Sequence, residues 1–250
     1  MAALISSGKP DEKEVYSTAL RIYSWTPTTF IKREVPPKRR QKNQRGEYII
    51  DPFVKELFQI EASALNLLSQ TKIKVPKLVD SGPDENGLAF IEMELWGGIP
   101  GSRVREECRM PDGEKHVDAG ECTLCEEKAW ANAESYVTNV VLPELAKLRS
   151  KTMGLDGKVV PPPWVRYHDN RPTWVSKVSD TDQYVFCNWD IGAHNMMFNY
   201  GTLEVIGVYD WENAGFFPPE FQFVNRSRQE FDAQFEDVPK VRRLIALLDA

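Results

Sequence analysis

The chain has 250 residues, 42% of them hydrophobic, and a formal net charge of -6 at pH 7, so it can form one large domain or two lobes with a hydrophobic core. The acidic balance argues against a nucleic-acid partner, because binding to phosphate backbones normally needs a basic face. No apolar run approaches the roughly 18 residues that span a bilayer, and residues 1–5 are too short for a signal-peptide core, so we expect a cytoplasmic protein without a membrane partner.

The N-terminal part is predicted to contain strands followed by a long helix. Residues 19–23 and 29–33 are strand-like runs separated by Thr26-Pro27. Asp51-Pro52, an N-cap acceptor followed by proline, predicts the start of a helix that runs to about Ser69. One face of this helix carries Val54, Leu57, Phe58, Leu65 and Leu68, with Glu61 in the middle.

Glu61 is the unexpected residue of that helix. A buried carboxylate needs a partner, and Lys32 on the preceding strand is a candidate. Kinases use such a strand lysine and helix glutamate to hold nucleotide phosphates. The alternative is that Glu61 reaches solvent at a gap in an imperfect apolar stripe. Lys55 is a poor rival, because its position points elsewhere on the helix.

A basic segment lies between the second strand and the helix. Residues 38–45 are rich in lysine and arginine and follow Pro36-Pro37. Such a run can be a nuclear-localisation signal or a patch for an anionic partner. We interpret it as a solvated surface loop, because charged runs with proline usually lie on the surface.

The middle of the chain is predicted to contain a strand, a loop and a helix. Residues 88–95 form a strand-like run that ends near Gly97-Gly98. Residues 101–125 are rich in charge and turn formers, and we expect an insertion or a mobile loop there. A long helical stretch follows, which Pro143 must kink or divide. Its residues near helical spacing, which we expect in the core, are Trp130, Ala133, Val137, Val140, Leu145 and Leu148.

The cysteines leave two interpretations open. Cys122 and Cys125 have zinc-ligand spacing, and Cys108 and His116 lie close enough in sequence to complete a site of four ligands. A second C-x-x-C pair is absent from the sequence, although structural zinc sites usually show paired motifs. We therefore favour a reduced pair where the loop meets the helix, and keep a zinc-stabilised interaction module as the alternative.

A hairpin is predicted in the last third of the chain. Residues 196–199 and 203–209 are strand-like runs, and Tyr200-Gly201 between them is a turn signal. In an antiparallel hairpin the start of the first strand meets the end of the second. Asn195 and Asp210 should therefore converge, despite their separation in sequence.

Three oxygen-bearing side chains are thus predicted to lie near one another. Magnesium prefers hard oxygen ligands, which Asn195 and Asp210 provide, and Asp190 in the preceding loop can accept a proton from a substrate hydroxyl. Each residue alone is more often a turn or cap residue. An Asp, an Asn five residues later and a further Asp form the kinase catalytic arrangement, so we interpret the trio as functional.

These residues resemble a known family. Residues 186–195, FCNWDIGAHN, and 208–216, VYDWENAGF, are similar to the pattern H-G-D-x-x-x-x-N followed by I-D-W-E-x-A-G of the aminoglycoside phosphotransferase and choline kinase-like superfamily. Within it, the resemblance is closest to fungal phosphotransferase-domain proteins of mostly unassigned substrate. The resemblance extends from about Phe30 to Glu220. Asn188 stands where the pattern has His, and Gly8 is the only glycine before Lys32, so no Gly-rich phosphate loop precedes that lysine.

The resemblance implies an α+β, protein kinase-like two-lobed fold with a reduced N-terminal lobe. Residues 1–94 would form a small nucleotide-binding lobe, and residues 95–250 a mainly helical catalytic lobe. The hinge between them would place backbone groups near Glu94 to Trp96 against the adenine.

The predicted function is transfer of the nucleotide γ-phosphate to a hydroxyl of an unidentified small molecule, with ATP and Mg2+. Asp190 would be the base, Asn195 and Asp210 would hold Mg2+, and Lys32, oriented by Glu61, would contact the phosphates. The alternative is a catalytically silent binding or scaffold protein of the same fold, which the missing glycines favour and the intact trio opposes.

Overall fold

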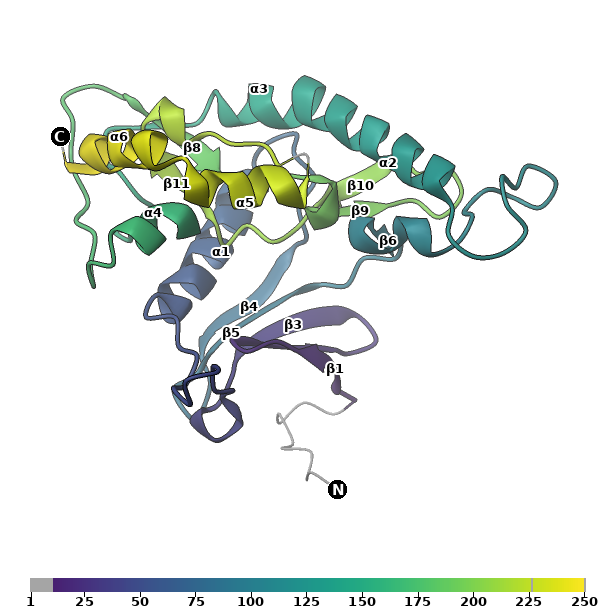
Figure 1. The fold of residues 1–250 in the computed structure, drawn as a ribbon, viewed down its shortest axis with the longest axis horizontal. Coiled ribbons are helices and arrows are strands. Elements are labelled where there is room, and N and C mark those ends of the chain that lie inside the picture. The colour runs from purple at the N-terminus through teal and green to yellow at the C-terminus, as the bar shows by residue number, and fades with distance from the viewer. Residues whose placement is uncertain (1–10, 226, 250) are drawn as a thin grey trace.

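The computed structural model describes residues 11–225 and 227–249, which form two lobes (Figure 1). The N-terminal lobe is an antiparallel sheet with one long helix, and the C-terminal lobe combines helices with small sheets. The predicted α+β, two-lobed arrangement is therefore confirmed. The boundary between residues 94 and 95 stays a prediction, and residues 1–5 and Gly8 lie outside the described residues.

The sheet of the N-terminal lobe places Lys32 on an interior strand. Its strand order is β1-β2-β3-β5-β4, and Lys32 of β3 lies opposite Tyr23 of β2 and Ile91 of β5. Strand β1 was not predicted, because its side chains show no alternation of buried and exposed positions. The strands are β1 (Lys13–Ser17), β2 (Arg21–Trp25), β3 (Thr29–Glu34), β4 (Leu78–Pro83) and β5 (Ala89–Glu94).

Helix α1 (Val54–Leu68) connects the sheet with the rest of the molecule. It contacts β4 and β5, and Figure 1 shows it running from the sheet toward the C-terminal lobe. The predicted apolar face is buried and contains Glu61. The predicted start is wrong, because Phe53 is the N-cap. Asp51 instead accepts a hydrogen bond from the Phe53 N–H at 2.9 Å and pairs with Arg166 at 3.0 Å.

The long helix of the C-terminal lobe is interrupted where proline was expected to disturb it. Helix α2 (Thr123–Tyr136) continues through a π-helical turn, Val137–Val141, into α3 (Leu142–Leu145). Proline cannot donate the backbone hydrogen bond and crowds the carbonyl four residues earlier, which the wider turn before Pro143 relieves. The prediction that Trp130 belongs to the core is wrong, because this residue is 43% exposed.

The predicted hairpin is confirmed, and a buried strand of another sheet precedes it in the chain. Met196 of β9 pairs with Val208 of β10. Strand β8 is buried along its whole length, and it carries the chain to Asn188 at the start of the predicted catalytic loop. The strands of the small sheets are β6 (Ile99–Pro100), β7 (Arg149–Ser150), β8 (Tyr184–Asn188), β9 (Met196–Phe198), β10 (Val205–Val208) and β11 (Ala214–Phe217).

Short helices complete the described structure. After the 3-10 helix η2, residues 107–122 contain no further helix or strand and project beyond the start of α2 (Figure 1). Among the described residues, no helix is both long and apolar enough to cross a membrane. These elements are η1 (Pro37–Arg39), η2 (Gly101–Glu106), α4 (Pro163–His168), η4 (Ala193–Asn195), η5 (Pro219–Phe221), α5 (Arg228–Glu236) and α6 (Val238–Asp249).

Candidate active site

Lys32 lies in a buried cluster of charged side chains between the two lobes. Its Nζ donates to both carboxylate oxygens of Glu61 at 2.9 Å, so the predicted pair forms. The Lys32 side chain is 5% exposed and that of Glu61 is fully buried. Two buried charges lose their hydration, and only close, hydrogen-bonded geometry of this kind compensates.

Further carboxylates reach Lys32 from the C-terminal lobe. Asp210 Oδ1 lies 2.7 Å from Lys32 Nζ, and Glu212 lies 4.0 Å from it and 3.3 Å from Arg21 of β2. The Asp210 backbone has a φ of 63°, a left-handed conformation that costs energy for a residue with a side chain. Carboxylate oxygens of Glu61, Asp210 and Glu212 lie within 4.8 Å of one another, close enough to share a metal ion.

The pKa values of the carboxyl groups in this cluster depend on burial and on the neighbouring charges. Burial raises the pKa of Glu61 to about 7, although Lys32 opposes the shift. Burial and the neighbouring Asp210 raise the pKa of Glu212. For Asp210 burial acts in the same direction, but Lys32 outweighs it and lowers the pKa. Because three carboxylates face two cations, Lys32 and Arg21, the cluster has an excess of negative charge that would attract a divalent cation.

Asp190 is positioned by hydrogen bonds from polar side chains. Asn225 Nδ2 donates to its Oδ1 at 2.9 Å, Asn195 Nδ2 approaches Oδ2 at 3.1 Å, and His194 Nε2 lies 3.1 Å from Oδ1. Asn188 is buried, and its Oδ1 accepts the backbone N–H of Asp190 at 2.8 Å. The residue that replaces the His of the family pattern therefore fixes the loop by a hydrogen bond. The Asp190 side chain remains 23% exposed.

The hairpin brings Asn195 to the region of Asp210, as predicted. The backbone N–H of Tyr209 donates to the Asn195 carbonyl at 2.9 Å, one residue before Asp210. Asn195 Nδ2 also donates to the Asp190 backbone carbonyl at 2.9 Å. With its nitrogen directed at Asp190, Asn195 would offer its amide oxygen to a metal ion.

The turn between β1 and β2 takes the place of a kinase Gly-rich loop. In kinases that loop covers the nucleotide phosphates. Here Thr18 Oγ1 accepts the N–H groups of Leu20 and Arg21, at 3.3 and 3.0 Å. The rings of Tyr16 and Tyr23, on the strands that flank the turn, stack with centroids 4.3 Å apart. The N–H groups of Leu20 and Arg21 are thus already bound within the turn.

The predicted hinge residues lie apart from the charged cluster and bind one another. Trp96 Nε1 donates to Glu94 Oε2 at 3.2 Å. The N–H groups of Glu94 and Leu95 donate to the Lys77 and Thr28 carbonyls, at 2.9 and 3.0 Å. The Trp96 ring packs so closely on β10 that a Cβ at Gly207 would lie 2.4 Å from it. The side chain of Trp96 therefore joins the lobes, and only backbone groups not already paired could meet adenine.

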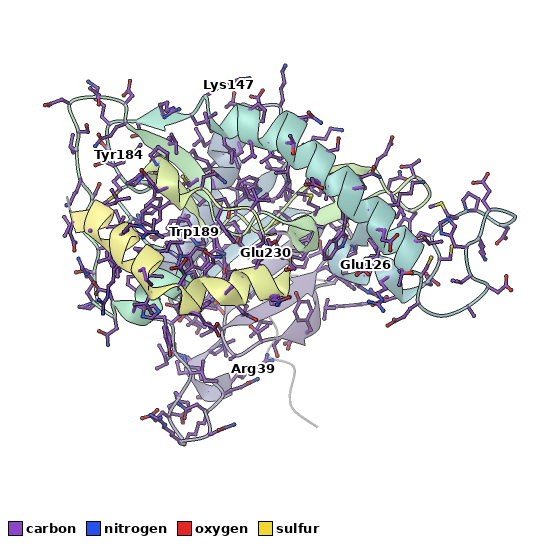
Figure 2. The ribbon with its side chains drawn as sticks, turned by 45° about the horizontal axis from the view of Figure 1, so that its top comes forward. Arg39, Glu126, Lys147, Tyr184, Trp189 and Glu230 are labelled. Carbon is purple, nitrogen blue, oxygen red and sulfur yellow. The ribbon has the colours of Figure 1, made fainter. Side chains whose placement is uncertain are left out.

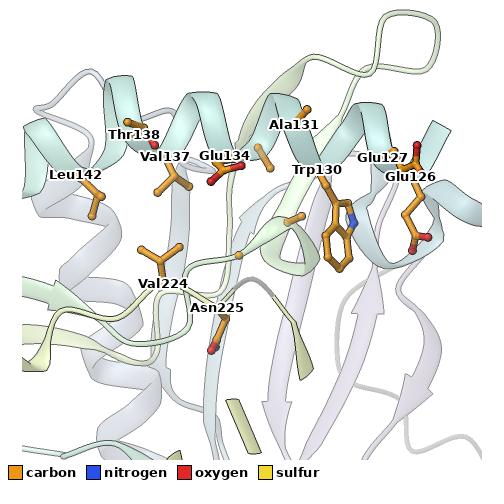
Figure 3. Close-up of a pocket in the computed structure, with 13 residues that line it drawn as sticks. Glu126, Glu127, Trp130, Ala131, Glu134, Val137, Thr138, Leu142, Val224 and Asn225 are labelled. Carbon is orange, nitrogen blue, oxygen red and sulfur yellow. The ribbon is translucent and has the colours of Figure 1, made fainter. Parts of the chain in front are cut away.

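A pocket of about 600 Å³ opens beside the predicted catalytic loop, residues 188–195. Gly192, Ala193 and Asn225 line one side of it. Figure 3 shows Trp130 and Val137 extending from the helical side toward the segment that carries Val224 and Asn225. The acidic residues of its lining are Glu126, Glu127 and Glu134. Because Asn225 also donates to Asp190, a molecule in the pocket would lie near that carboxylate.

Sequence reasoning missed several residues of this site. Glu212 follows Asp210 by two positions in the D-W-E stretch, which was the available signal. No signal in the sequence pointed to Arg21 or Asn225, since their contacts, with Glu212 and Asp190, are made with distant parts of the chain. Trp130 followed the helical spacing of the core and yet lines the pocket.

No protein-family model matches the chain, and no curated protein matches its sequence. Solved structures that resemble it include aminoglycoside 2'-phosphotransferase-IIIa in complex with GDP, at 10% identity and a TM-score of 0.46 over 98% of this chain and 79% of that one. Type VIII aminoglycoside-3'-phosphotransferase shares 16% identity, with a TM-score of 0.47 over 96% and 94%. A Streptomyces rimosus aminoglycoside phosphotransferase bound to ADP and streptomycin shares 16%, with a TM-score of 0.38 over 97% and 93%.

These structures belong to the enzyme class whose motif the sequence resembles. Their TM-scores, all below 0.5, describe a loose likeness.

Proposed function

We propose that this chain is a cytoplasmic phosphotransferase that moves the γ-phosphate of ATP to a hydroxyl of a small molecule. The observation that supports it most is the meeting of Lys32, Glu61 and Asp210. These residues come from β3, α1 and the segment after β10. Lys32 Nζ lies 2.9 Å from Glu61 Oε1 and 2.7 Å from Asp210 Oδ1. Kinases use this combination of strand lysine, helix glutamate and metal-binding aspartate.

Magnesium fits the donor atoms that this chain offers. Asp210 contributes a carboxylate whose lowered pKa keeps it ionised, and Asn195 contributes an amide oxygen. Hard oxygen donors of this kind suit Mg2+, which takes one or two carboxylates and completes its shell with water and phosphate. Asp210 and Asn195 would hold the ion, with Glu212 nearby. When bound, it would neutralise charge on the phosphates.

Asp190 and Lys32 would have different roles in the transfer of the phosphoryl group. Asp190 accepts the proton of the acceptor hydroxyl as that oxygen forms its bond to the γ-phosphorus. The bond from that phosphorus to the bridging oxygen of ADP breaks, and ADP leaves. Lys32 contacts the nucleotide phosphates in exchange for its contact with Asp210, while Glu61 keeps the ammonium group in place.

The acceptor would bind in the pocket beside the catalytic loop. Glu126, Glu127 and Glu134 give the pocket an acidic lining, and Trp130 offers an aromatic surface. A positively charged hydroxyl compound suits both features, through attraction to carboxylates and contact with an indole ring.

An acceptor screen tests this function. The 250-residue chain is incubated with MgATP and a panel of sugars, amino alcohols and amino sugars, and ADP formation is measured. We expect turnover with at least one charged acceptor, and its loss in Asp190→Asn. The matched control is Asp182→Asn, which changes an exposed carboxylate outside the site. Equal rates for the Asp190 and Asp182 variants would exclude Asp190 as the base.

The second candidate is a catalytically silent binding protein of the same fold. The β1–β2 turn favours it, because Thr18 already accepts the N–H groups that a phosphate would need. A thermal-shift titration with MgATP separates the two. Ligand at a hundred times its Kd stabilises a protein by about 2.7 kcal/mol, which for about 250 residues raises Tm by roughly 5–10 °C. No shift at millimolar MgATP would support the silent protein.

A further inference from the structure

Three cysteines and a histidine meet at the base of the loop that precedes α2. Cys108 and His116 belong to the loop, Cys122 is the N-cap residue of α2, and Cys125 lies in its first turn. One ligand atom from each residue lies within 4.8 Å of all the others. Figure 2 shows sulfur atoms where this loop joins the helix, near the labelled Glu126. The sequence has no second C-x-x-C pair, but the fold brings Cys108 and His116 close enough to provide the other two ligands.

Three of the six separations between these atoms match the edges of a tetrahedron around zinc, and the others are no longer than 4.8 Å. Zinc binds sulfur at about 2.3 Å and histidine nitrogen at about 2.0–2.1 Å, so a regular tetrahedron has edges of about 3.8 Å between sulfurs and about 3.6 Å between sulfur and nitrogen. Cys108 and Cys125 sulfurs lie 3.8 Å apart. His116 Nδ1 lies 3.5 Å from the Cys122 sulfur and 3.7 Å from that of Cys125.

Backbone groups around the cluster favour thiolates. The N–H of Arg109 donates to the Cys125 sulfur and the N–H of His116 donates to the Cys108 sulfur, each at 3.3 Å. Donors of this kind orient metal-bound sulfur and stabilise its charge. A disulfide does not account for the arrangement, because the bonded sulfurs would lie about 2.0 Å apart. Thiolate and imidazole together select zinc over magnesium or calcium.

We propose that Cys108, His116, Cys122 and Cys125 bind one structural zinc ion that holds the loop of residues 107–122 against the start of α2. The protein supplies all four ligands, so the site is closed and has no open position for a substrate. Each thiol that binds the ion releases its proton to solvent.

The position of this site gives the ion a role in shaping the pocket. The Cys122 N–H donates to the Arg105 carbonyl at 2.9 Å, which links α2 to η2. At the other end of η2, Gly101 lies against the catalytic loop, where a Cβ would come within 1.8 Å of the Ala193 carbonyl. Glu126 and Trp130 follow Cys125 along α2 and line the pocket. The ion would therefore fix one wall of the pocket relative to the catalytic loop.

Metal analysis of the purified full-length chain tests the proposal. After expression in zinc-supplemented medium and dialysis without chelator, we expect about one zinc per chain. Cys122→Ser with Cys125→Ser should contain less than a tenth of that amount, whereas Cys187→Ala, which removes the cysteine outside the cluster, should keep it. Cobalt in place of zinc should give the absorption bands of tetrahedral thiolate coordination.

His116→Gln keeps the test valid even if the double cysteine variant does not fold. The His116 side chain is exposed, so its replacement leaves the core intact. We expect this variant to release zinc to a chelator at a concentration at least about tenfold lower than wild type requires. Metal-free wild-type protein, or unchanged zinc retention in both ligand variants, would overturn the proposal.

Discussion

The two halves of the candidate active site hold their key carboxylates by different means. Asp210 lies against the charged Lys32, within a cluster of ionised groups. Asp190 is held instead by two asparagine amides and a histidine. A carboxylate paired with a lysine is a poor proton acceptor, because the cation stabilises its ionised form. This difference supports the proposal that the Lys32 cluster binds metal and phosphate and that Asp190 accepts the proton.

The largest expected effect comes from removing the base. Asp190→Asn preserves the shape of the side chain but cannot accept a proton, and general-base catalysis contributes about 10²- to 10⁴-fold. We therefore expect kcat to fall by about that factor while Tm changes little. The acceptor found by the screen provides the assay. A decrease below about threefold would mean that the two carboxylates do not divide their roles as described.

Breaking the Lys32 cluster should instead act on stability. Lys32→Met leaves Glu61 buried without its cation, which costs about 3–5 kcal/mol when one partner of a buried pair is removed. Urea unfolding measures the loss. Replacing both residues, Lys32→Met with Glu61→Leu, should recover much of it, because the fully buried carboxylate of Glu61 is then removed together with its cation. If Lys32→Met alone unfolds like wild type, the pair is not the buried contact seen here.

Glu61 also predicts a pH dependence. Burial raises its pKa from 4.5 to about 7, so between these values the folded state binds more protons than the unfolded state. The stability that the neutral carboxyl contributes is present below pH 4.5 and is lost as the pH rises toward 7. We expect wild type to lose stability relative to Glu61→Gln across this window, by at most about 1.4 kcal/mol per pH unit. Parallel pH profiles of unfolding free energy for the two proteins would contradict the shift.

The smallest expected effect lies in the basic segment. Arg39 pairs with Glu14 on the surface, where the two side chains are 35% and 30% exposed. Exposed ion pairs contribute about 0.2–1 kcal/mol. Arg39→Ala should therefore cost less than about 1 kcal/mol in urea unfolding, and high salt should reduce even that. A larger loss would show that this segment has a structural role beyond a solvated loop.

Local patterns in the sequence predicted the parts of the site that depend on local structure. Turn residues between two strand-like runs placed Asn195 near Asp210, because strand pairing fixes which ends of a hairpin meet. The helical period placed Glu61 on a buried face, and a buried carboxylate requires a cation, which led to Lys32. The two lobes, by contrast, were expected from the resemblance of the motifs to a known family and not from local patterns.

The remaining parts depend on contacts between elements that are distant in sequence. Trp130 has the spacing of a core residue, yet the surface opposite it is a pocket. Arg21 meets Glu212 across the two lobes, a contact that no spacing encodes. The cysteine cluster was underestimated for the same reason, because the position of Cys108 is set by the path of an irregular loop.

The central claim is that the Lys32 and Asp210 cluster binds a nucleotide together with Mg2+, and calorimetric titration of the chain with ATP tests it most directly. We predict binding that requires Mg2+, weakened about 100-fold or more in Asp210→Asn and unchanged in the exposed-site control Asp182→Asn. Binding of ATP that is equally tight without Mg2+ and in the Asp210 variant would contradict the account.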